Sequence, residues 1–352
     1  MFYGIFVVLA LLFLVSRNII EDSDKMLVFY AAVSFLVVIC GLRDPFIYPD
    51  NISYYEFYTG DFSAADDGTL NKGYLLFNWL MGYLAPTFQV FCFVVAIIII
   101  CSYSKLILLY SPYIWLSLFL YVLINFLPSF FLLRQYLAMP FVFLSFKYVI
   151  ERRQLMYWVF VLLAFSIHTT AIIVMPLYYM YGLSYSRRNM LIVFGGTILA
   201  SLSFMAIGAI IGSYFTYYSQ YLDMQVEDPA WQRALMKVYI LLVYLFAMKD
   251  QFYDSGINRL VFYSMLMNVI ICIGAMNFFG VFRLREFFSL ADFIGIPIIL
   301  STATQMFFPK KHAVILLTGV YIVLLILSYI SFAEGGNMAN GYDFFWENSQ
   351  FM

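Results

Sequence analysis

The sequence has very little charge for its length. Only 11% of its 352 residues are Asp, Glu, Lys or Arg, while 64% are hydrophobic and 21% are aromatic. Soluble domains carry about 25% charged residues, so this inventory excludes a water-exposed globular surface. The formal net charge of −1 also supplies no basic excess for binding nucleic acid. We therefore expect a membrane protein without a nucleic-acid partner.

Signatures of disulfide, metal and nucleotide chemistry are also absent from the sequence. The cysteines lie in apolar segments without the spacing of a disulfide framework or a metal site; they are Cys40, Cys92, Cys101 and Cys272. There is no glycine-rich dinucleotide loop and no Walker phosphate loop. We therefore expect neither a cofactor nor a resident metal.

What the sequence has instead is a series of apolar runs along nearly its whole length. In lipid the backbone must satisfy its own hydrogen bonds, which leaves helices or closed barrels. The period-two alternation of barrel strands is absent. The runs lie near residues 2–16, 26–41, 87–104, 112–127, 130–149, 155–167, 169–182, 189–212, 232–248, 256–279, 287–308 and 313–333. They predict an all-α polytopic integral membrane protein with about 10–12 transmembrane helices, including a short re-entrant or broken pair.

The chain is expected to form a single transmembrane domain over residues 1–352. Its N-terminal run lacks a basic leader and a cleavage site, so it predicts a first span rather than a signal peptide. The stretch 73–85 ends at Pro86 and predicts a re-entrant or interfacial helix. Extracytoplasmic loops are expected near residues 42–72, 213–231 and 280–286, with a C-terminal tail over 334–352.

The distribution of lysines and arginines gives the expected orientation. If the N-terminus lies outside the cytoplasm, twelve of the nineteen basic residues fall on the cytoplasmic side, as the positive-inside rule requires. The twelve are Arg17, Lys25, Lys105, Lys147, Arg152, Arg153, Arg187, Arg188, Lys249, Arg259, Lys310 and Lys311. The seven on the other side are Arg43, Lys72, Arg134, Arg233, Lys237, Arg283 and Arg285. We therefore expect both termini and the loop 42–72 to face away from the cytoplasm.

The segment between two arginine pairs predicts a hairpin. Arg152 and Arg153 precede residues 155–182, and Arg187 and Arg188 follow them. Both pairs favour the cytoplasm, so the chain must enter the membrane and return to the same side. This places His168 at the outer turn.

Under this orientation the unusual polar residues gather on the extracytoplasmic side. Arg43 follows the second run, Arg134 lies four or five residues into an apolar run, and His168 lies at the hairpin turn. Arg283 and Arg285 follow in "FGVFRLREFF". An arginine inside an apolar helix is costly if it faces lipid, so it normally faces a cavity or a partner.

Each of these residues also has a simpler interpretation. Arg134 could extend its side chain to the lipid headgroups. Arg283 and Arg285 could be interfacial anchors, with Arg283 paired to Glu286 at helical spacing. His168 could be a satisfied histidine in a helix turn. Each signal is weak alone, and their common depth on one face is what favours a site.

Two further residues of the first long loop have comparable alternatives. Asp50 could simply cap a short helix that begins "NISYYEFY". Tyr54 could belong to the aromatic belt of the membrane interface.

Clustered arginines at an outer membrane face suit a diphosphate held on a lipid. The guanidinium group binds phosphate oxygens in a bidentate manner and stays charged at any relevant pH. The loop "GSYFTYYSQYLDMQVEDPAWQR" adds aromatic faces and carboxylates for sugar rings, so it is the expected glycan contact, with Tyr218, Tyr221 and Trp231 as candidates. A donor activated as a lipid diphosphate needs no nucleotide site.

Five stretches of the chain, in this order, resemble the EpsG-like branch of the Wzy-type bacterial surface-polysaccharide polymerases. They are "GLRDPFIYPDNISYYEFY", "NKGYLLFNWL", "LLRQYLAMPFVFLSFKY", "FSIHTTAIIVMPLYY" and "RLREFFSLADF". The residues that match the family patterns are Arg43, Asp50 and Tyr54, then Gly73 and Tyr74, Arg134 and Gln135, His168 and Thr169, and finally Arg283 or Arg285. A family glycine before the aspartate is replaced by Pro49. The resemblance covers roughly residues 35–295.

The resemblance implies an O-antigen-type polysaccharide polymerase at the outer face of the bacterial inner membrane. Such a glycosyltransferase moves a growing glycan from undecaprenyl diphosphate to the terminal sugar of a lipid-linked repeat unit. The expected partners are undecaprenyl-diphosphate-linked oligosaccharides and the lipid bilayer. A flippase, a chain-length regulator and a ligase are implied by the pathway.

Roles for the matched residues follow from that implied reaction. Arg134 with Arg283 or Arg285 is expected to bind the donor diphosphate and stabilise the leaving charge. Arg43 is expected to hold a second lipid diphosphate or to orient the loop.

Acid–base and glycan roles fall to the other matched residues. Asp50 and His168 are candidates for the catalytic base, and His168 near its ordinary pKa could equally donate a hydrogen bond to phosphate. Tyr54 and Gln135 are expected to contact the glycan.

Two other classes of membrane protein stay open at this point. A lipid-linked oligosaccharide flippase would line a path through both halves of the membrane with charge, whereas the charges here favour one face. A polysaccharide O-acyltransferase would need a catalytic histidine, and the sequence offers only His168 and His312.

Overall fold

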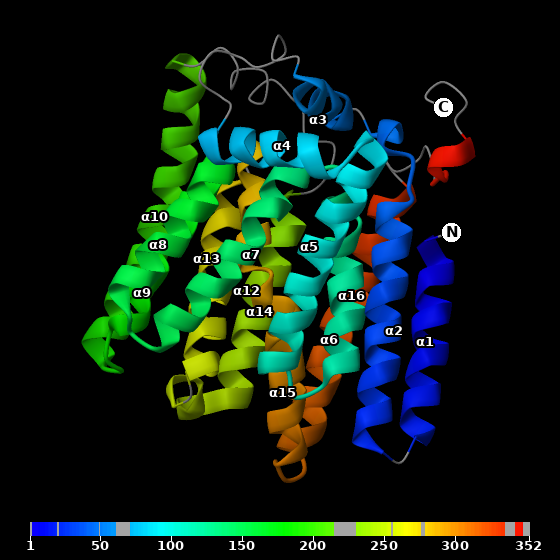
Figure 1. Cartoon of the computed structure of the whole chain (residues 1–352). Coiled ribbons are helices and arrows are strands. Elements are labelled where there is room, and N and C mark those ends of the chain that lie inside the picture. Colours follow the sequence, from blue (N-terminus) through cyan, green and yellow to red (C-terminus); the bar gives the residue numbers. More distant parts are fainter. Residues whose placement is uncertain are drawn as a thin grey trace.

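The computed structural model is a bundle of helices whose axes run mostly in one direction (Figure 1). It describes residues 2–19, 21–48, 50–60, 71–214, 230–254, 256–275, 279–334 and 342–347. The first part of the chain forms α1 (Phe2–Asn18), α2 (Asp22–Gly41), η1 (Pro45–Ile47), α3 (Asp50–Thr59), α4 (Lys72–Leu84), α5 (Phe88–Tyr110), α6 (Ile114–Tyr121), η2 (Val122–Phe126), η3 (Pro128–Phe130) and α7 (Leu133–Ile150). The second part forms α8 (Gln154–Ile167), η4 (Thr169–Val174), α9 (Pro176–Gly182), α10 (Arg187–Tyr214), α12 (Ala230–Met248), η5 (Lys249–Tyr253), α13 (Gly256–Gly274), η6 (Phe279–Phe288), α14 (Leu290–Phe293), α15 (Gly295–Thr304), α16 (Lys310–Glu334) and η8 (Phe345–Glu347).

Within the described residues, five helices are long and apolar enough to cross a membrane on their own. They are α2, α5, α12, α13 and α16. A sixth span is available if residues 282–288 and 290–304, which are bent by 45°, cross together. Three other apolar runs form shorter helices, in α1, in α6 with η2, and in α8. The expected all-α polytopic membrane protein is therefore confirmed, and the described residues offer five or six spans where about 10–12 were expected, with α13 the most buried of them.

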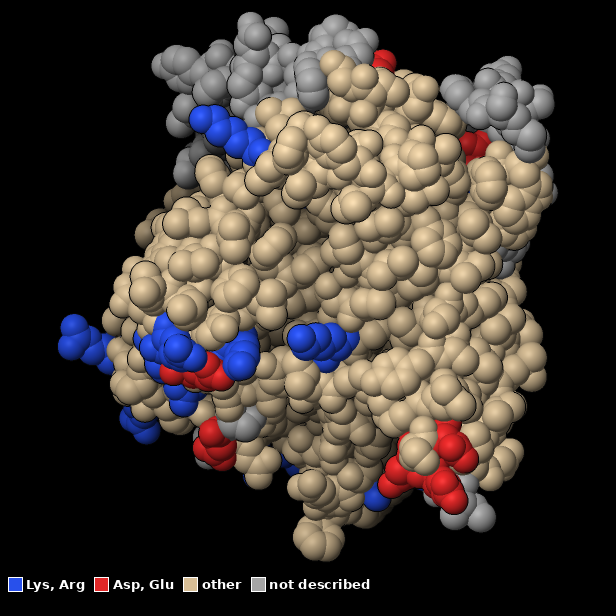
Figure 2. All heavy atoms as spheres, in the orientation of Figure 1, with Lys and Arg blue, Asp and Glu red and all other residues tan. Residues whose placement is uncertain are grey.

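The surface agrees with a membrane setting. Figure 2 shows a face that is mostly uncharged, with a basic patch near the lower ends of α8 and α9 and other charges toward the two ends of the bundle. Large apolar side chains are exposed along the outer helices, for example Leu11 in α1 and Leu327 in α16. Such an exposed apolar surface is what a lipid-facing bundle requires.

The predicted hairpin between the arginine pairs is confirmed. The end of α9 returns to the start of α8, because the Arg152 guanidinium donates to the carbonyl of Tyr178 (2.6 Å) and lies over its ring at 4.1 Å. The hydroxyl of Tyr157 in turn donates to the carbonyl of Val174. Residues 154–182 therefore go up and come back, with His168 between α8 and η4.

The stretch predicted as re-entrant or interfacial is α4, which lies across the end of the bundle (Figure 1). Its apolar side chains Trp79, Tyr83 and Leu84 are exposed, while Tyr74 and Met81 are buried against the bundle. This arrangement is that of an interfacial helix. The same end of the bundle carries α3 and the described C-terminal segment, residues 342–347 (Figure 1).

The described part of the C-terminal tail, residues 342–347, is attached to the first loop. The backbone of Asp44 donates to Asp343, and that of Phe345 donates to Leu42, at 2.8 and 3.1 Å. Arg43 and Phe344 form an isolated antiparallel bridge. The segment thus packs beside η1 and α5.

Candidate functional site

At the end of the bundle that carries α3 and α4, four residues predicted as a site come from four separate elements. Arg134 lies in the first turn of α7, Asp50 begins α3, His168 follows α8, and Arg283 lies in η6. Arg283 Nη1 lies 3.9 Å from Asp50 Oδ2. The charges of Arg134 and Arg283 both act on His168. We call these four residues the outer cluster.

Arg134 sits closer to the helix end than the sequence predicted. The helix before it is broken by the π-helical turn η2 and by Pro128, because proline cannot continue the hydrogen-bond ladder. α7 consequently begins at Leu133, so Arg134 belongs to its first turn instead of lying a full turn inside an apolar helix. Its side chain is partly buried, and its Nε has no hydrogen-bond partner among the described residues.

The neighbours of Arg134 are aromatic rings. Its guanidinium carbon lies 5.9 Å from the ring centre of Tyr54 and 5.8 Å from that of Tyr74, contacts worth about 0.5–2 kcal/mol each. Burial raises the pKa of both tyrosines, so they stay neutral phenols beside the cation. Tyr54 is therefore a buried wall of the site and not a member of an interfacial belt. The positive charge of Arg134 is left without an anionic neighbour among the described residues.

The close approach of α4 to α8 brings Tyr74 into this position. Gly73 lies against the backbone of Ser166, and a Cβ at residue 73 would come within 2.7 Å of that carbonyl oxygen. Asn71 Nδ2 also donates to the carbonyl of Phe165 (2.9 Å). The Gly-aromatic pair noted in the sequence is thus a packing contact that places one ring of the site.

Arg283 is bound from two sides. Its carbonyl accepts a hydrogen bond of 2.7 Å from Gln135 Nε2, and its guanidinium approaches the half-exposed carboxylate of Asp50. In the alternative interpretation Arg283 would pair with Glu286, but among the described residues Glu286 pairs with Arg285 and Arg283 with Asp50. Gln135 therefore holds η6 in place from α7, next to Arg134.

The structure changes the chemistry expected of His168. Burial, together with the nearby charges of Arg134 and Arg283, lowers its pKa to about 3. The imidazole is thus neutral at neutral pH and is a weak base. The expectation of an ordinary pKa for His168 is therefore corrected, since partial burial beside two cations disfavours a third positive charge.

Arg43 lies apart from the outer cluster in its contacts. It is almost completely buried, and it donates to the carbonyls of Cys40 and Phe130, the latter at 2.9 Å. The carbonyl of Phe130 also accepts from Asn51 Nδ2 at 3.0 Å. Arg43 thus ties the first loop to η3 and so supports the orienting role that the sequence left open for it.

Arg285 points into a second, more buried network. Its Nε lies 3.0 Å from Glu286 Oε1, and its guanidinium covers the ring of Phe282 at 3.7 Å. Glu286 Oε2 accepts hydrogen bonds of 2.8 Å from Asn125 Nδ2 and from the hydroxyl of Tyr136. Arg285 is therefore paired with a buried carboxylate, whereas Arg283 reaches the outer cluster.

Sequence reasoning missed a neighbouring buried ion pair. Lys237 Nζ of α12 lies 2.6 Å from Asp292 Oδ2 of α14, and Tyr321 of α16 donates to Asp292 Oδ1 at 2.7 Å. Arg233, which also belongs to α12, lies over the ring of Phe282 at 4.0 Å. The available signal was the presence of single charges inside predicted spans, because such residues normally face a partner.

The predicted glycan contacts are only partly described. Tyr218 and Tyr221 lie outside the described residues. Trp231, at the start of α12, is 53% exposed. Tyr54 and Gln135 belong to the walls of the outer cluster, the first through Arg134 and the second through Arg283.

Comparison with known proteins gives one match. The family model described as "EpsG family" matches residues 26–345. The chain belongs to the EpsG family. No curated protein and no solved structure matches it.

Membership in the EpsG family indicates a polysaccharide-related membrane glycosyltransferase or polymerase. The matched region contains all four residues of the outer cluster and the described C-terminal segment as far as Phe345. A multi-pass membrane location agrees with both the family and the spans.

Proposed function

We propose that this EpsG-family protein is a polysaccharide polymerase that uses lipid-diphosphate-linked sugars. It transfers a growing glycan from undecaprenyl diphosphate to the terminal sugar of a lipid-linked repeat unit of O-antigen type. The reaction takes place at the outer face of the bacterial inner membrane. The outer cluster is the site of transfer.

The observation that carries this proposal is the uncompensated charge of the outer cluster. The cluster contains two arginines and one carboxylate: Arg283 approaches Asp50, whereas Arg134 lies beside the rings of Tyr54 and Tyr74 and forms no ion pair among the described residues. With a neutral His168, the cluster has an excess of one positive charge. A partly buried guanidinium of this kind is suited to a diphosphate, whose oxygens match its bidentate geometry.

In the proposed reaction a hydroxyl oxygen of the acceptor sugar attacks the anomeric carbon of the donor glycan. The bond from that carbon to the diphosphate oxygen breaks, and undecaprenyl diphosphate leaves with the electron pair. Arg134 and Arg283 stabilise the charge that develops on the diphosphate. Such preorganised electrostatic stabilisation is usually the largest catalytic contribution.

Asp50 is the better candidate to take the proton of the acceptor hydroxyl. Its carboxylate is half-exposed and therefore accessible to a substrate, and Arg283 orients it from 3.9 Å. His168 with a pKa of about 3 is a poor base. It serves as a neutral hydrogen-bonding group, for which the imidazole has one donor and one acceptor nitrogen.

Gel analysis of surface glycan from a deletion strain tests this proposal. Loss of a polymerase leaves a single repeat unit on the lipid anchor, because repeats are still made and exported. Loss of a flippase leaves none, because repeats stay on the cytoplasmic side. Single-repeat glycan in the deletion strain, restored to long chains by the intact gene, supports a polymerase; absence of any repeat supports the flippase alternative.

A further inference from the structure

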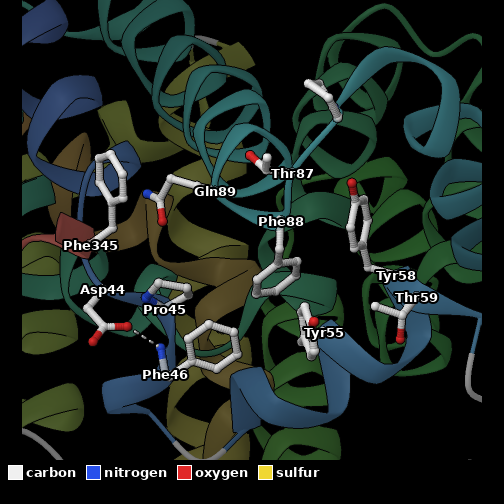
Figure 3. Close-up of a pocket in the computed structure, with 11 residues that line it drawn as sticks. Asp44, Pro45, Phe46, Tyr55, Tyr58, Thr59, Thr87, Phe88, Gln89 and Phe345 are labelled. Carbon is white, nitrogen blue, oxygen red and sulfur yellow. Dashed lines mark hydrogen bonds between the residues drawn. The ribbon is translucent and has the colours of Figure 1, made fainter. Parts of the chain in front are cut away.

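A pocket separate from the outer cluster opens at the same end of the bundle (Figure 3). Its volume is about 280 Å³. Small-molecule sites start near ~300 Å³, so the pocket suits one ring of sugar size. Its walls come from η1, α3, the start of α5 and the C-terminal segment. Among the residues that line it are Asp44, Phe46, Tyr55, Thr59, Phe88, Gln89 and Phe345.

The aromatic walls of this pocket hold one another in place. The rings of Phe46 and Tyr55 meet edge to face at 5.3 Å, and those of Tyr55 and Phe88 do so at 5.4 Å. Tyr58 is fixed by a hydrogen bond from its hydroxyl to the carbonyl of Ala85 (2.5 Å). Rigid rings present flat apolar faces without loss of side-chain entropy on binding.

Polar groups of the pocket are also fixed in orientation. Asp44 Oδ1 accepts a hydrogen bond of 2.9 Å from the backbone of Phe46 (Figure 3). Gln89 Nε2 donates to the carbonyls of Gly41 and Arg43, which turns the amide oxygen toward the pocket (Figure 3). A carboxylate and an amide oxygen beside aromatic faces are what a sugar ring needs, since it has apolar C–H faces and hydroxyl groups at its edge.

The helix α3 connects this pocket with the outer cluster. Asp50 and Tyr54, four residues apart, lie on the face toward Arg134 and Arg283. Tyr55 and Thr59, again four residues apart, lie on the face that lines the pocket. Residues at this spacing share one side of a helix, so the two sites lie on two sides of α3, about one helix diameter or ~10 Å apart.

We propose that this pocket binds a sugar of the glycan chain at a distance from the reacting sugar. The inference rests on the proposed polymerase function and adds a second glycan subsite to it. A chain whose end reacts at the outer cluster passes over α3 and places a later ring between Phe88, Gln89 and Phe345. The ligand is uncharged carbohydrate and not the lipid diphosphate.

A substitution that fills the pocket tests the proposal. Thr59 is exposed, ends α3 and donates its Oγ1 to the carbonyl three residues before it, so Thr59→Trp adds a ring to the pocket without entering the core. Thr304 is the matched control, since it ends α15, is exposed, and donates to Ser301 in the same way. It lies at the opposite end of the bundle (Figure 1). Phe345→Ala is a second variant, which removes an aromatic wall of the pocket instead of filling the pocket.

The probe is a set of phosphate-free oligosaccharides of one to four repeats, released from the surface polysaccharide of the source strain. Binding is measured by calorimetry on the full chain in nanodiscs. We expect Thr59→Trp to weaken binding at least tenfold and Thr304→Trp to leave it unchanged. Wild-type affinity in both Thr59→Trp and Phe345→Ala would overturn the inference, as would an effect restricted to lipid-linked probes.

Polymerisation by the same proteins separates this inference from the proposed function. With lipid-linked repeats, Thr59→Trp is expected to yield shorter chains than the wild type, and the control Thr304→Trp chains of wild-type length. If the wild type binds the glycan but does not polymerise the repeats, the polymerase function is refuted and the glycan-binding role of the pocket is not. If Thr59→Trp makes chains of normal length and binds the glycan as the wild type does, the glycan pocket is refuted and the polymerase function is not.

Discussion

Arg134 differs from Arg283 and Arg285 because its described neighbours are rings and not carboxylates. Arg283 faces Asp50, and Arg285 is paired with buried Glu286. The sequence could identify all three as unusual, since arginine is costly in an apolar run. It could not separate them, because partner choice depends on how η6 lies against α3 and α7.

Replacement of Arg134 by lysine tests whether the guanidinium grips a diphosphate. Lysine keeps the charge but loses the bidentate geometry and is more strongly hydrated. We expect Arg134→Lys to insert normally and to lose about 2–4 kcal/mol of transition-state stabilisation, or roughly 30- to 1,000-fold in rate. Chain polymerisation is measured at matched membrane levels of protein. Wild-type activity in this variant would instead support the interpretation that Arg134 extends to the lipid headgroups, which lysine can do equally well.

The lowered pKa of His168 predicts that the stability of the folded protein depends on pH. Its folded pKa of about 3 lies below the unfolded value of about 6.5, so the unfolded chain binds the extra proton first. Stability is therefore full above pH 6.5 and falls as the pH is lowered toward 3. At pH 4.5 the loss is on the order of 1–3 kcal/mol.

The measurement is thermal unfolding in detergent at pH 7.5 and pH 4.5. The variant His168→Gln lacks the titration and should lose less stability between these two pH values than the wild type. Equal losses in the two proteins would contradict a partly buried, neutral imidazole in the folded protein. Polymerisation by the wild type should also show no step near pH 6.5 that His168→Gln removes.

Among the elements, the apolar runs predicted most helices well and their interruptions poorly. α5, α13 and α16 lie where hydropathy placed them. The start of α7 and the bend between η6 and α14 depend on a π-helical turn, Pro128 and tertiary contacts. These breaks set the depth of Arg134 and Arg283, so the site geometry required the folded structure.

The ion pair of Lys237 and Asp292 connects α12 with α14, and its loss should destabilise the packing of these two helices. Lys237→Met leaves the Asp292 carboxylate buried without its cation, which costs about 3–5 kcal/mol for a buried pair. The double variant Lys237→Met with Asp292→Asn removes both charges and should recover part of that loss. The melting temperature of the purified proteins measures this. A single variant as stable as the wild type would show that the pair has no structural role.

On the scale of the whole molecule, the charge distribution predicted a topology that the fold accommodates. The hairpin 154–182 returns to its starting side, and α3, α4 and the described C-terminal segment gather at one end (Figure 1). Local sequence could suggest this because arginine pairs flank the hairpin. It could not show that the first loop and the C-terminal segment form a pocket, since those residues are about 300 positions apart.

Cysteine labelling tests the orientation of the bundle. A cysteine introduced at position 62 in the first long loop should react with a membrane-impermeant reagent added from outside. A cysteine at position 310 should react only after the membrane is opened. The native Cys101 is exposed and is replaced by serine in both variants. The reverse pattern of labelling would invert the topology and move the outer cluster to the cytoplasmic side.

Reconstituted polymerisation tests the central claim most directly. The purified protein is placed in liposomes with undecaprenyl-diphosphate-linked repeat units as the sole sugar source and with excess chelator, because arginines supply the positive charge at the diphosphate. We expect a ladder of lipid-linked glycans and one undecaprenyl diphosphate released for each linkage formed. Repeat units that remain single, or a ladder that appears only when a divalent metal is restored, would contradict it.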